Sequence, residues 1–275
     1  MIKSLAGATI VVPDLDAAIA AYREWPGYQP SPVVAFDAAE AEAWKAPQAA
    51  GARTSTLTPE SGEARFLRLV EGRPDPAFRP MGALGWNAVE IIVQDVEALA
   101  VKLARPGSPF AVIGAPAVLD FDFTDKIKAM QVSGPGGEVL YLTEVAEPVP
   151  GFDLPEAKSF VGQPFIMVMG SRDIDAAARP YVERGRTLSP IFEARIDVLS
   201  DAHGIDRMRR HQLATVAFDE ASLIEIDIFP STAIDRPLSS LGLPSGIAIA
   251  HFHGAGGERV DRLVGGAAEW IEVRS

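Results

Sequence analysis

Cysteine is absent from this chain of 275 residues, and its 4 histidines all lie beyond residue 202. Without cysteine, the chain can form no disulfide, no thiolate nucleophile and no cysteine-bound zinc site. Basic residues are also scarce, since 25 Lys and Arg stand against 37 Asp and Glu, for a formal net charge of −12. Such a surface repels phosphate backbones, so we expect no nucleic-acid partner.

Long apolar runs are missing as well. No stretch approaches the roughly 20 apolar residues that span a bilayer, and Pro13 and Asp14 end the first apolar run before it could serve as a signal sequence. We therefore expect a soluble, cytoplasmic protein without a membrane partner. With 48% hydrophobic residues, the chain can form one large core or two modest ones, and its length favours two domains.

A repeat is the clearest positive feature. A strand pattern, a turn with a helix-capping aspartate and an amphipathic helix recur at 8–22 (ATIVVPDLDAAIAAY), 88–103 and 165–182. The turn aspartates Asp14, Asp95 and Asp173 lie 81 and 78 residues apart, which predicts a fourth unit near residue 253. Residues 247–264 (IAIAHFHGAGGERVDRLV) fit that unit, with glycines in place of the aspartate.

Each of the first three helices is followed by a predicted hairpin, at 53–70, 126–145 and 211–229. The proline-rich segment 146–157 reads as a linker, so we predict domains at 1–147 and 158–275. After its helix the fourth unit has room for one strand only, which leaves a sheet edge that needs a cover. A homodimer or a packed loop is our hypothesis for that cover.

A β-α-β-β-β unit repeated in pairs, with the turn VPDLD (12–16) and the hairpin GGEVLYL (136–142), resembles the vicinal oxygen chelate superfamily. This superfamily includes glyoxalase I, bleomycin-resistance proteins and extradiol dioxygenases. The resemblance implies an α+β fold in which tandem βαβββ modules pair into two half-open barrel domains, with the fourth module truncated. It also implies a small-molecule ligand and, in many members, a divalent metal held by His, Gln or Glu.

The metal-ligand positions that the resemblance implies can be tested in the first domain. They map to Gly7 and Ala88 in the first strands, and to Arg68 and Tyr141 in the last strands. We therefore expect no metal in the first domain. Candidate pocket-lining residues there are Trp86, Asn87 and Met130, with Tyr141 as a candidate acid-base group, although packing in the core or barrel wall is the more common role of such side chains.

The second domain holds all the histidines. Glu225, flanked by Ile224 and Ile226, occupies the last-strand carboxylate position, and the two imidazoles of His251 and His253 share one strand face. Together these three could hold a divalent metal, although the alternation also suits an ordinary solvent-facing strand. His211, at the start of a strand, is a second candidate acid-base residue.

Two functions stay open at this point. The first is an enzyme acting on a small organic, possibly aromatic, substrate, of lyase, isomerase or ring-cleaving dioxygenase type, with any metal in the second domain. The alternative is a metal-free binding protein for small molecules, of the bleomycin-resistance type. The sequence does not identify the substrate.

Overall fold

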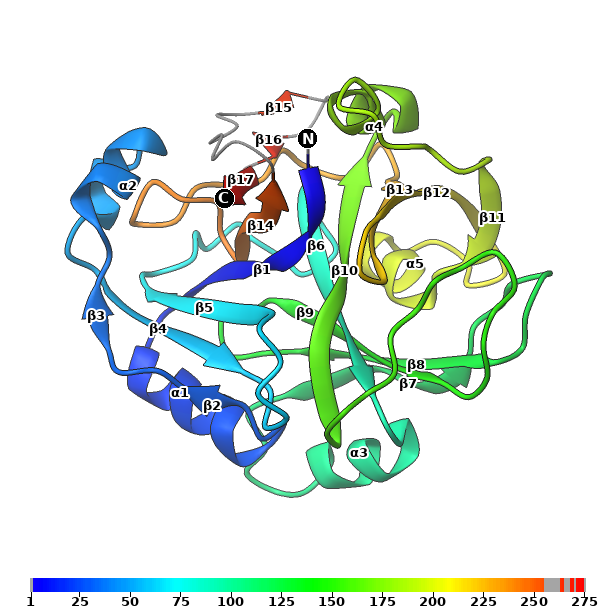
Figure 1. Cartoon of the computed structure of the whole chain (residues 1–275), viewed down its shortest axis with the longest axis horizontal. Helices are drawn as coiled ribbons and strands as arrows, with labels where there is room; N and C mark the ends of the chain where they lie inside the picture. The colour runs from blue at the N-terminus through cyan, green and yellow to red at the C-terminus, as the bar shows by residue number, and fades with distance from the viewer. Residues whose placement is uncertain (1, 255–262, 265–267, 270, 275) are drawn as a thin grey trace.

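A computed structural model describes residues 2–254, 263–264, 268–269 and 271–274 of the chain. Its helices and strands fall into four consecutive modules (Figure 1). Module one contains β1 (Ile2–Val12), α1 (Leu15–Glu24), β2 (Gln29–Pro30), β3 (Val34–Ala35), α2 (Ala38–Ala43), the 3-10 helix η1 (Pro47–Ala49), β4 (Arg53–Thr58) and β5 (Phe66–Glu71). Module two contains β6 (Gly85–Val93), α3 (Val96–Leu103), β7 (Ala111–Val118), β8 (Ile127–Ser133) and β9 (Val139–Val145).

Module three contains β10 (Val161–Ser171), α4 (Ile174–Val182), β11 (Phe192–Arg195), α5 (Asp197–His203), β12 (Arg210–Phe218) and β13 (Ser222–Ile228). Module four retains β14 (Ile247–Gly254) and β17 (Ile271–Arg274), with the short strands β15 (Leu263–Val264) and β16 (Ala268–Glu269) between them. The expected turn and helix of this module fall mainly on 255–262, outside the described residues. The mixed α+β class is as predicted.

The predicted aspartate caps are confirmed. The side chain of Asp14 accepts a hydrogen bond from the backbone N–H of Ala17 at 2.9 Å, and Asp95 and Asp173 cap α3 and α4 in the same way. Each cap satisfies an open N–H group in the first helical turn. In every module the last strand then runs parallel to the first, as in β1 with β5 and β6 with β9.

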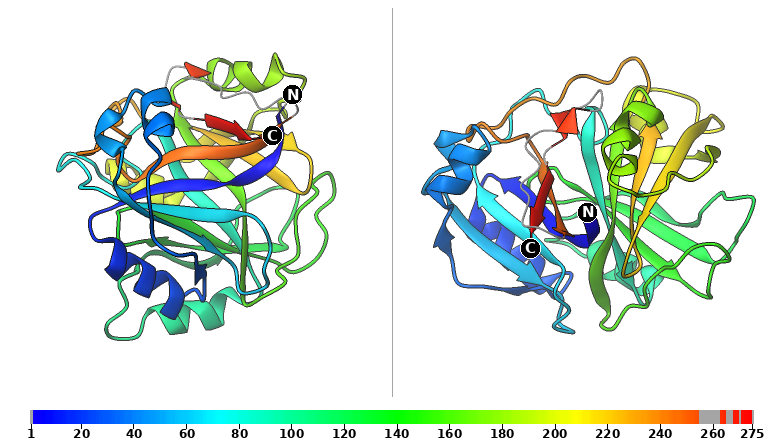
Figure 2. Two further views of the ribbon diagram at one scale, coloured as in Figure 1. Left: turned by 60° about the vertical axis from the view of Figure 1, so that its left-hand side comes forward. Right: turned by 45° about the horizontal axis from the view of Figure 1, so that its top comes forward.

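The modules pair differently from our prediction. One curled sheet has the order β17-β14-β1-β5-β4-β2 and joins modules one and four, while the other has the order β11-β12-β13-β10-β6-β9-β8-β7 and joins modules two and three. Figure 2 shows the two sheets side by side. Pairing of consecutive modules within 1–147 and within 158–275 is therefore wrong. Whether those two segments act as separate folding domains stays a prediction.

The linker between modules two and three explains this pairing. β9 runs parallel to β6, and β10 starts opposite the end of β6, with Val161 facing Val93. The linker therefore only has to pass the end of one strand, and chain segments joined by short connections tend to pair in space.

Three apolar clusters hold the fold together. The largest joins the outer faces of both sheets to α1, α3 and α4. The second lines the inner face of the β6–β10–β13 sheet together with α5. The third fills the inner face of the other sheet with α2, η1 and the loop that carries Leu241 and Leu243. We call the sheet of modules one and four the filled half-barrel, and the sheet of modules two and three the hollow half-barrel.

The hairpin turn at 133–138 serves this packing. Glu138 is buried at 1% exposure and accepts hydrogen bonds from the backbone N–H of Gly136 and from the hydroxyl of Tyr22 on α1. Burial raises the pKa of Glu138 to about 7. The acidic residue of this turn thus joins module one to module two.

Candidate functional site

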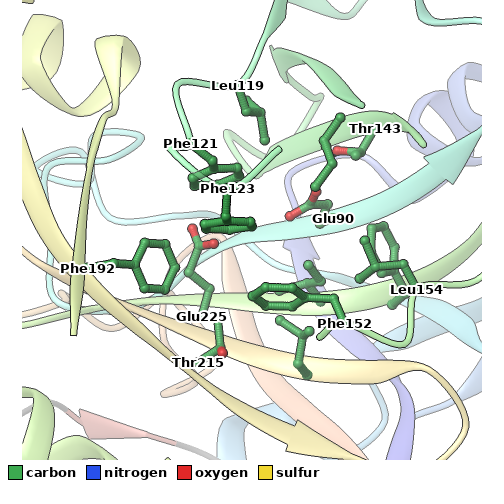
Figure 3. Close-up of a pocket in the computed structure, with 14 residues that line it drawn as sticks. Glu90, Leu119, Phe121, Phe123, Thr143, Phe152, Leu154, Phe192, Thr215 and Glu225 are labelled. Atoms are coloured by element: carbon green, nitrogen blue, oxygen red, sulfur yellow. The ribbon is translucent and has the colours of Figure 1, made fainter. Parts of the chain in front are cut away.

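The hollow half-barrel contains a cavity on its inner face. One compartment has a volume of about 50 Å³ and an adjoining one about 60 Å³. Both are bordered by Glu90 and Glu225, whose carboxyl groups point into the same space in Figure 3. The remaining walls are mainly apolar and aromatic, and they include Leu119, Phe121, Phe123, Phe152, Leu154 and Phe192.

Strand alternation brings the two glutamates to this face. On β6, Ala88 and Ile92 belong to the inner cluster, whereas Val89 and Ile91 belong to the outer core, so Glu90 faces inward. β10 separates β6 from β13, and Glu90 and Glu225 lie beside its residues Ile166 and Val168. At a strand spacing of about 4.8 Å, their Cα atoms are on the order of 10 Å apart across a curled sheet.

Glu90 is the deeper of the pair. It is 5% exposed, and its carboxyl accepts a hydrogen bond of 2.6 Å from the hydroxyl of Thr143. Burial, reinforced by the negative charge of Glu225, raises the pKa of Glu90 to about 8. Loss of hydration and a nearby like charge both disfavour the ionised form.

Glu225 keeps partial exposure to the cavity, and burial of its carboxyl raises its pKa to about 7. Behind it, Asp227 is fully buried, and no hydrogen-bond donor among the described residues reaches either of its oxygens. Burial and the Glu225 charge raise the pKa of Asp227 well above its ordinary value. These shifts favour the protonated form of Asp227, and burial brings the pKa values of Glu90 and Glu225 to about 8 and about 7.

Tyr141 borders the same cavity, as expected of a residue on the inner face of β9. Its hydroxyl has no hydrogen-bond partner among the described residues. Burial and the surrounding carboxylates raise the pKa of Tyr141 well above its ordinary value. The group therefore stays protonated and can donate a hydrogen bond to a ligand.

Four phenylalanines cover the cavity. The ring of Phe123 stacks on those of Phe121 and Phe152, with centroids 5.1 and 5.2 Å apart. The ring of Phe192 packs edge-on against Phe121 and Phe123. Phe123 nevertheless remains 45% exposed. An aromatic cover of this kind can pack on a flat apolar ligand.

The filled half-barrel has a different inner face. Arg68, in the last-strand position, forms a two-pronged ion pair with Glu40 of α2, and its Nε donates to the hydroxyl of Thr9 at 2.9 Å. His251 reaches the same hydroxyl through Nε2 at 2.6 Å and contacts the ring of Phe66. A guanidinium therefore provides the positive charge on this face.

The predicted metal set is not brought together. Glu225 lies in the hollow half-barrel, whereas His251 is buried and His253 exposed on β14 of the filled half-barrel. Across the described ranges, no three His, Cys, Asp or Glu side chains converge in a way that could hold a metal ion. The donors present therefore do not fit the metal that the fold family implies, and we assign no step to one.

The other predicted site residues lie away from the cavity. Trp86 and Met130 are both buried in the outer core. The side chain of Trp86 points outward because the register between β6 and β10 shifts between Val168 and Met169. Asn87 donates hydrogen bonds to the carbonyls of Ala83 and Gly85. These three side chains therefore have packing and backbone-anchoring roles.

His211 borders a separate hollow beside Phe229 and Pro230. Its Nε2 is 2.9 Å from the hydroxyl of Ser200 on α5, and burial lowers its pKa, which favours the neutral ring. The structure does not place it beside Glu90 and Glu225.

Glu90 is the residue that sequence reasoning missed. It is the only charged residue in the apolar strand 85–93 (GWNAVEIIV), five residues before the cap Asp95. Ala88, the ligand position that the resemblance implies in module two, lies two residues before Glu90 on the same inner face of β6. A count of five back from each cap gives Thr9, Glu90 and Val168, all first-strand residues beside the last-strand residues Arg68, Tyr141 and Glu225.

No protein-family profile matches the chain, and no curated protein matches it by sequence. Among solved structures, glyoxalase I from Zea mays has a TM-score of 0.56 and 15% identity, over 91% of this chain and 74% of that one. A putative dioxygenase from Bacillus subtilis has a TM-score of 0.59 and 10% identity, over 99% of this chain and 86% of that one. At these identities the likeness shows the fold.

Proposed function

The chain has the fold of the vicinal oxygen chelate superfamily, and from that premise we propose that it acts on a small, largely apolar organic molecule by proton transfer. The cavity of the hollow half-barrel is the binding site, and Glu90 and Glu225 are its acid-base pair. The reaction class is that of a lyase or isomerase. One observation carries the proposal: two carboxyl groups with near-neutral pKa values border one aromatic cavity.

The two glutamates differ in burial, and we assign them different roles in the proton transfer. Glu225 is partly exposed, so its ionised form is the better hydrated of the two and it is the base that accepts a proton from an acidic C–H group. Glu90 is 5% exposed and lies near the Glu225 charge, which favours its protonated form, so its carboxyl is the acid that returns a proton to a neighbouring atom of the same molecule. The pair ends with exchanged protonation states and gains no net proton.

Tyr141 complements this pair. Its protonated hydroxyl can donate a hydrogen bond to a carbonyl or enolate oxygen as negative charge develops there. Such a donor, fixed in a largely apolar cavity, stabilises that charge more than it would in water.

Deuterium exchange tests the proposal without knowledge of the natural substrate. Phenylacetone, a small aryl ketone with an acidic methylene group, is incubated with the protein in D₂O and its methylene signal is followed by NMR. We expect the wild-type protein to accelerate exchange, Glu225→Gln to abolish the acceleration and Tyr141→Phe to reduce it. Glu183→Gln, which changes an exposed glutamate at the end of α4, is the matched control and should keep the wild-type rate.

The alternative function, binding without catalysis, rests on the cover of four phenylalanines, which would suit an apolar ligand in the absence of chemistry. Binding of phenylacetone without faster exchange would support it. Absence of both binding and exchange would overturn both functions.

The chain's assembly and location stay proposals. None of the helices in the described part of the chain is long and apolar enough to cross a membrane. We keep the homodimer as a proposal for covering the edge of the filled half-barrel at β17, and we keep the proposal of a cytoplasmic location.

A further inference from the structure

Two arginines on neighbouring strands of the hollow half-barrel share one carboxylate oxygen, and one of them, Arg195, borders the cavity. Arg195 Nε donates to Asp120 Oδ2 at 2.9 Å, and Arg210 Nη1 donates to the same oxygen at 2.8 Å. The arginines face each other across the β11–β12 pair. Asp120 comes from the loop after β7, at the opposite edge of the same sheet.

This ion pair lies against the catalytic space. Asp120 and Arg195 border the compartment that Glu90, Tyr141 and Glu225 also border. Asp120 is followed by Phe121, which belongs to the aromatic cover. The ion pairs of Asp120 with Arg195 and Arg210 thus anchor the loop that covers the cavity.

A carboxylate from solution can replace Asp120 as the hydrogen-bond partner of these arginines. Its side chain is 29% exposed, and those of Arg195 and Arg210 are 42% and 33% exposed, so solvent reaches all three. Arg210 is also held by the carbonyl of Glu193, at 2.6 Å from its Nη2. The guanidinium of Arg210 therefore keeps a fixed partner when Asp120 leaves.

The two compartments are also too small, at about 50 and 60 Å³, to hold an organic molecule while the cover is closed. Entry of a ligand requires the loop of Asp120, Phe121 and Phe123 to move. That movement takes the two carboxylates of this loop, Asp120 and Asp122, away from the guanidinium groups of Arg195 and Arg210. Guanidinium groups bind carboxylates with directed hydrogen bonds.

We infer that Arg195 and Arg210 form a carboxylate-binding subsite, that Asp120 occupies it in the closed form, and that the ligand is a small aromatic carboxylate. The ligand's carboxylate binds the arginines and its ring enters the phenylalanine-lined cavity beside Glu90 and Glu225. This inference rests on the proposed function, since it names the class of molecule that the same cavity takes.

Benzoate and benzamide provide the test, because they share a shape and differ in charge. Affinities are measured by isothermal titration calorimetry for the wild type, Asp120→Asn and the double variant Arg195→Gln/Arg210→Gln. Asp201→Asn, which breaks the nearby exposed pair with Arg207, is the matched control.

We expect the wild type to bind benzoate about tenfold more tightly than benzamide, as a charge-assisted pair would give. Asp120→Asn should tighten benzoate binding by about a further tenfold and leave benzamide unchanged, because an internal competitor for the arginines is removed. The double variant should remove the preference for benzoate, and the control variant should match the wild type.

The outcomes separate this inference from the proposed function. Equal binding of the two probes, or equal tightening of both by Asp120→Asn, would show a cover that only opens more easily, and would overturn the carboxylate subsite. If phenylacetone exchange persists in that case, the proposed function stands. If neither probe binds and exchange is also absent, both are overturned.

Discussion

The filled and hollow half-barrels share a plan and differ in what occupies their inner faces. In the filled one, α2 brings Glu40 onto Arg68, and the hydroxyl of Thr9 joins that pair to His251. In the hollow one, the matching last-strand positions hold Tyr141 and Glu225, and within the described part of the chain neither Glu90 nor Glu225, which border the aromatic cavity, forms an ion pair. The first face is neutralised by an ion pair, and the second carries acids whose pKa values are raised.

The largest expected effect comes from breaking the filled half-barrel. Arg68→Met leaves Glu40 buried without its counter-charge, so we expect a loss of about 3–5 kcal/mol in the free energy of unfolding. Urea denaturation measures it. The double variant Glu40→Gln/Arg68→Met removes both charges and should recover a large part of the loss, whereas an unrecovered loss would show that packing, rather than the ion pair, holds this face.

In the hollow half-barrel, we expect removal of the buried acid Glu90 to raise the free energy of unfolding instead of lowering it. Because the folded-state pKa of Glu90 is raised from 4.5 to about 8, the folded protein binds this proton more tightly than the unfolded chain. The wild type should therefore lose stability as pH rises from about 4.5 to 8. Glu90→Gln should be more stable than the wild type by about 2–4 kcal/mol at pH 8.5 and little changed at pH 4.5.

Urea denaturation across this pH range checks that prediction. Glu183→Gln, at an exposed position, is the control and should follow the wild-type curve. A destabilised Glu90→Gln protein at pH 8.5 would mean that Glu90 is an ionised structural group.

A matched pair of phenylalanines compares the packing of the two faces. Phe36 is 2% exposed and lies under the Arg68 guanidinium, so Phe36→Ala should cost about 3 kcal/mol. Phe123 is 45% exposed on the cover of the hollow half-barrel, so Phe123→Ala should cost about 1 kcal/mol or less. Thermal unfolding of both variants gives the ranking, and equal losses would contradict the distinction between a filled and a covered face.

The smallest expected effect concerns the predicted metal set. His253 is exposed on β14, away from Glu225, so His253→Ala should change stability by less than about 0.5 kcal/mol. It should also leave the binding of added Fe²⁺ or Zn²⁺ unchanged in calorimetric titration. A weaker metal affinity in this variant would contradict this expectation and support a metal site that includes His253.

Local features of the fold could be read from the sequence, because they depend on neighbouring residues. Asp14, Asp95 and Asp173 cap their helices as expected, and the alternation around Glu225 correctly placed it opposite Ile224 and Ile226. Each of these predictions rests on a periodicity or a cap within a few residues.

Pairing between modules could not be read in this way. It depends on which strand ends lie close enough for a linker to join, and the repeat makes every first strand a plausible partner for every other. His251 and Glu225 consequently seemed able to meet, although they belong to different sheets. Asp120 shows the same limit, since its partners on β11 and β12 become neighbours only when the sheet curls.

The central claim is that Glu90 and Glu225 act as an acid-base pair in the hollow half-barrel. Its most direct test is an NMR titration of the side-chain carboxyl carbons in ¹³C-labelled protein, with Glu90→Gln and Glu225→Gln used to assign the two signals. We predict that both groups titrate near or above pH 7, and that removal of Glu225 lowers the pKa of Glu90. Titration of both near the ordinary value of about 4.3 would contradict the account.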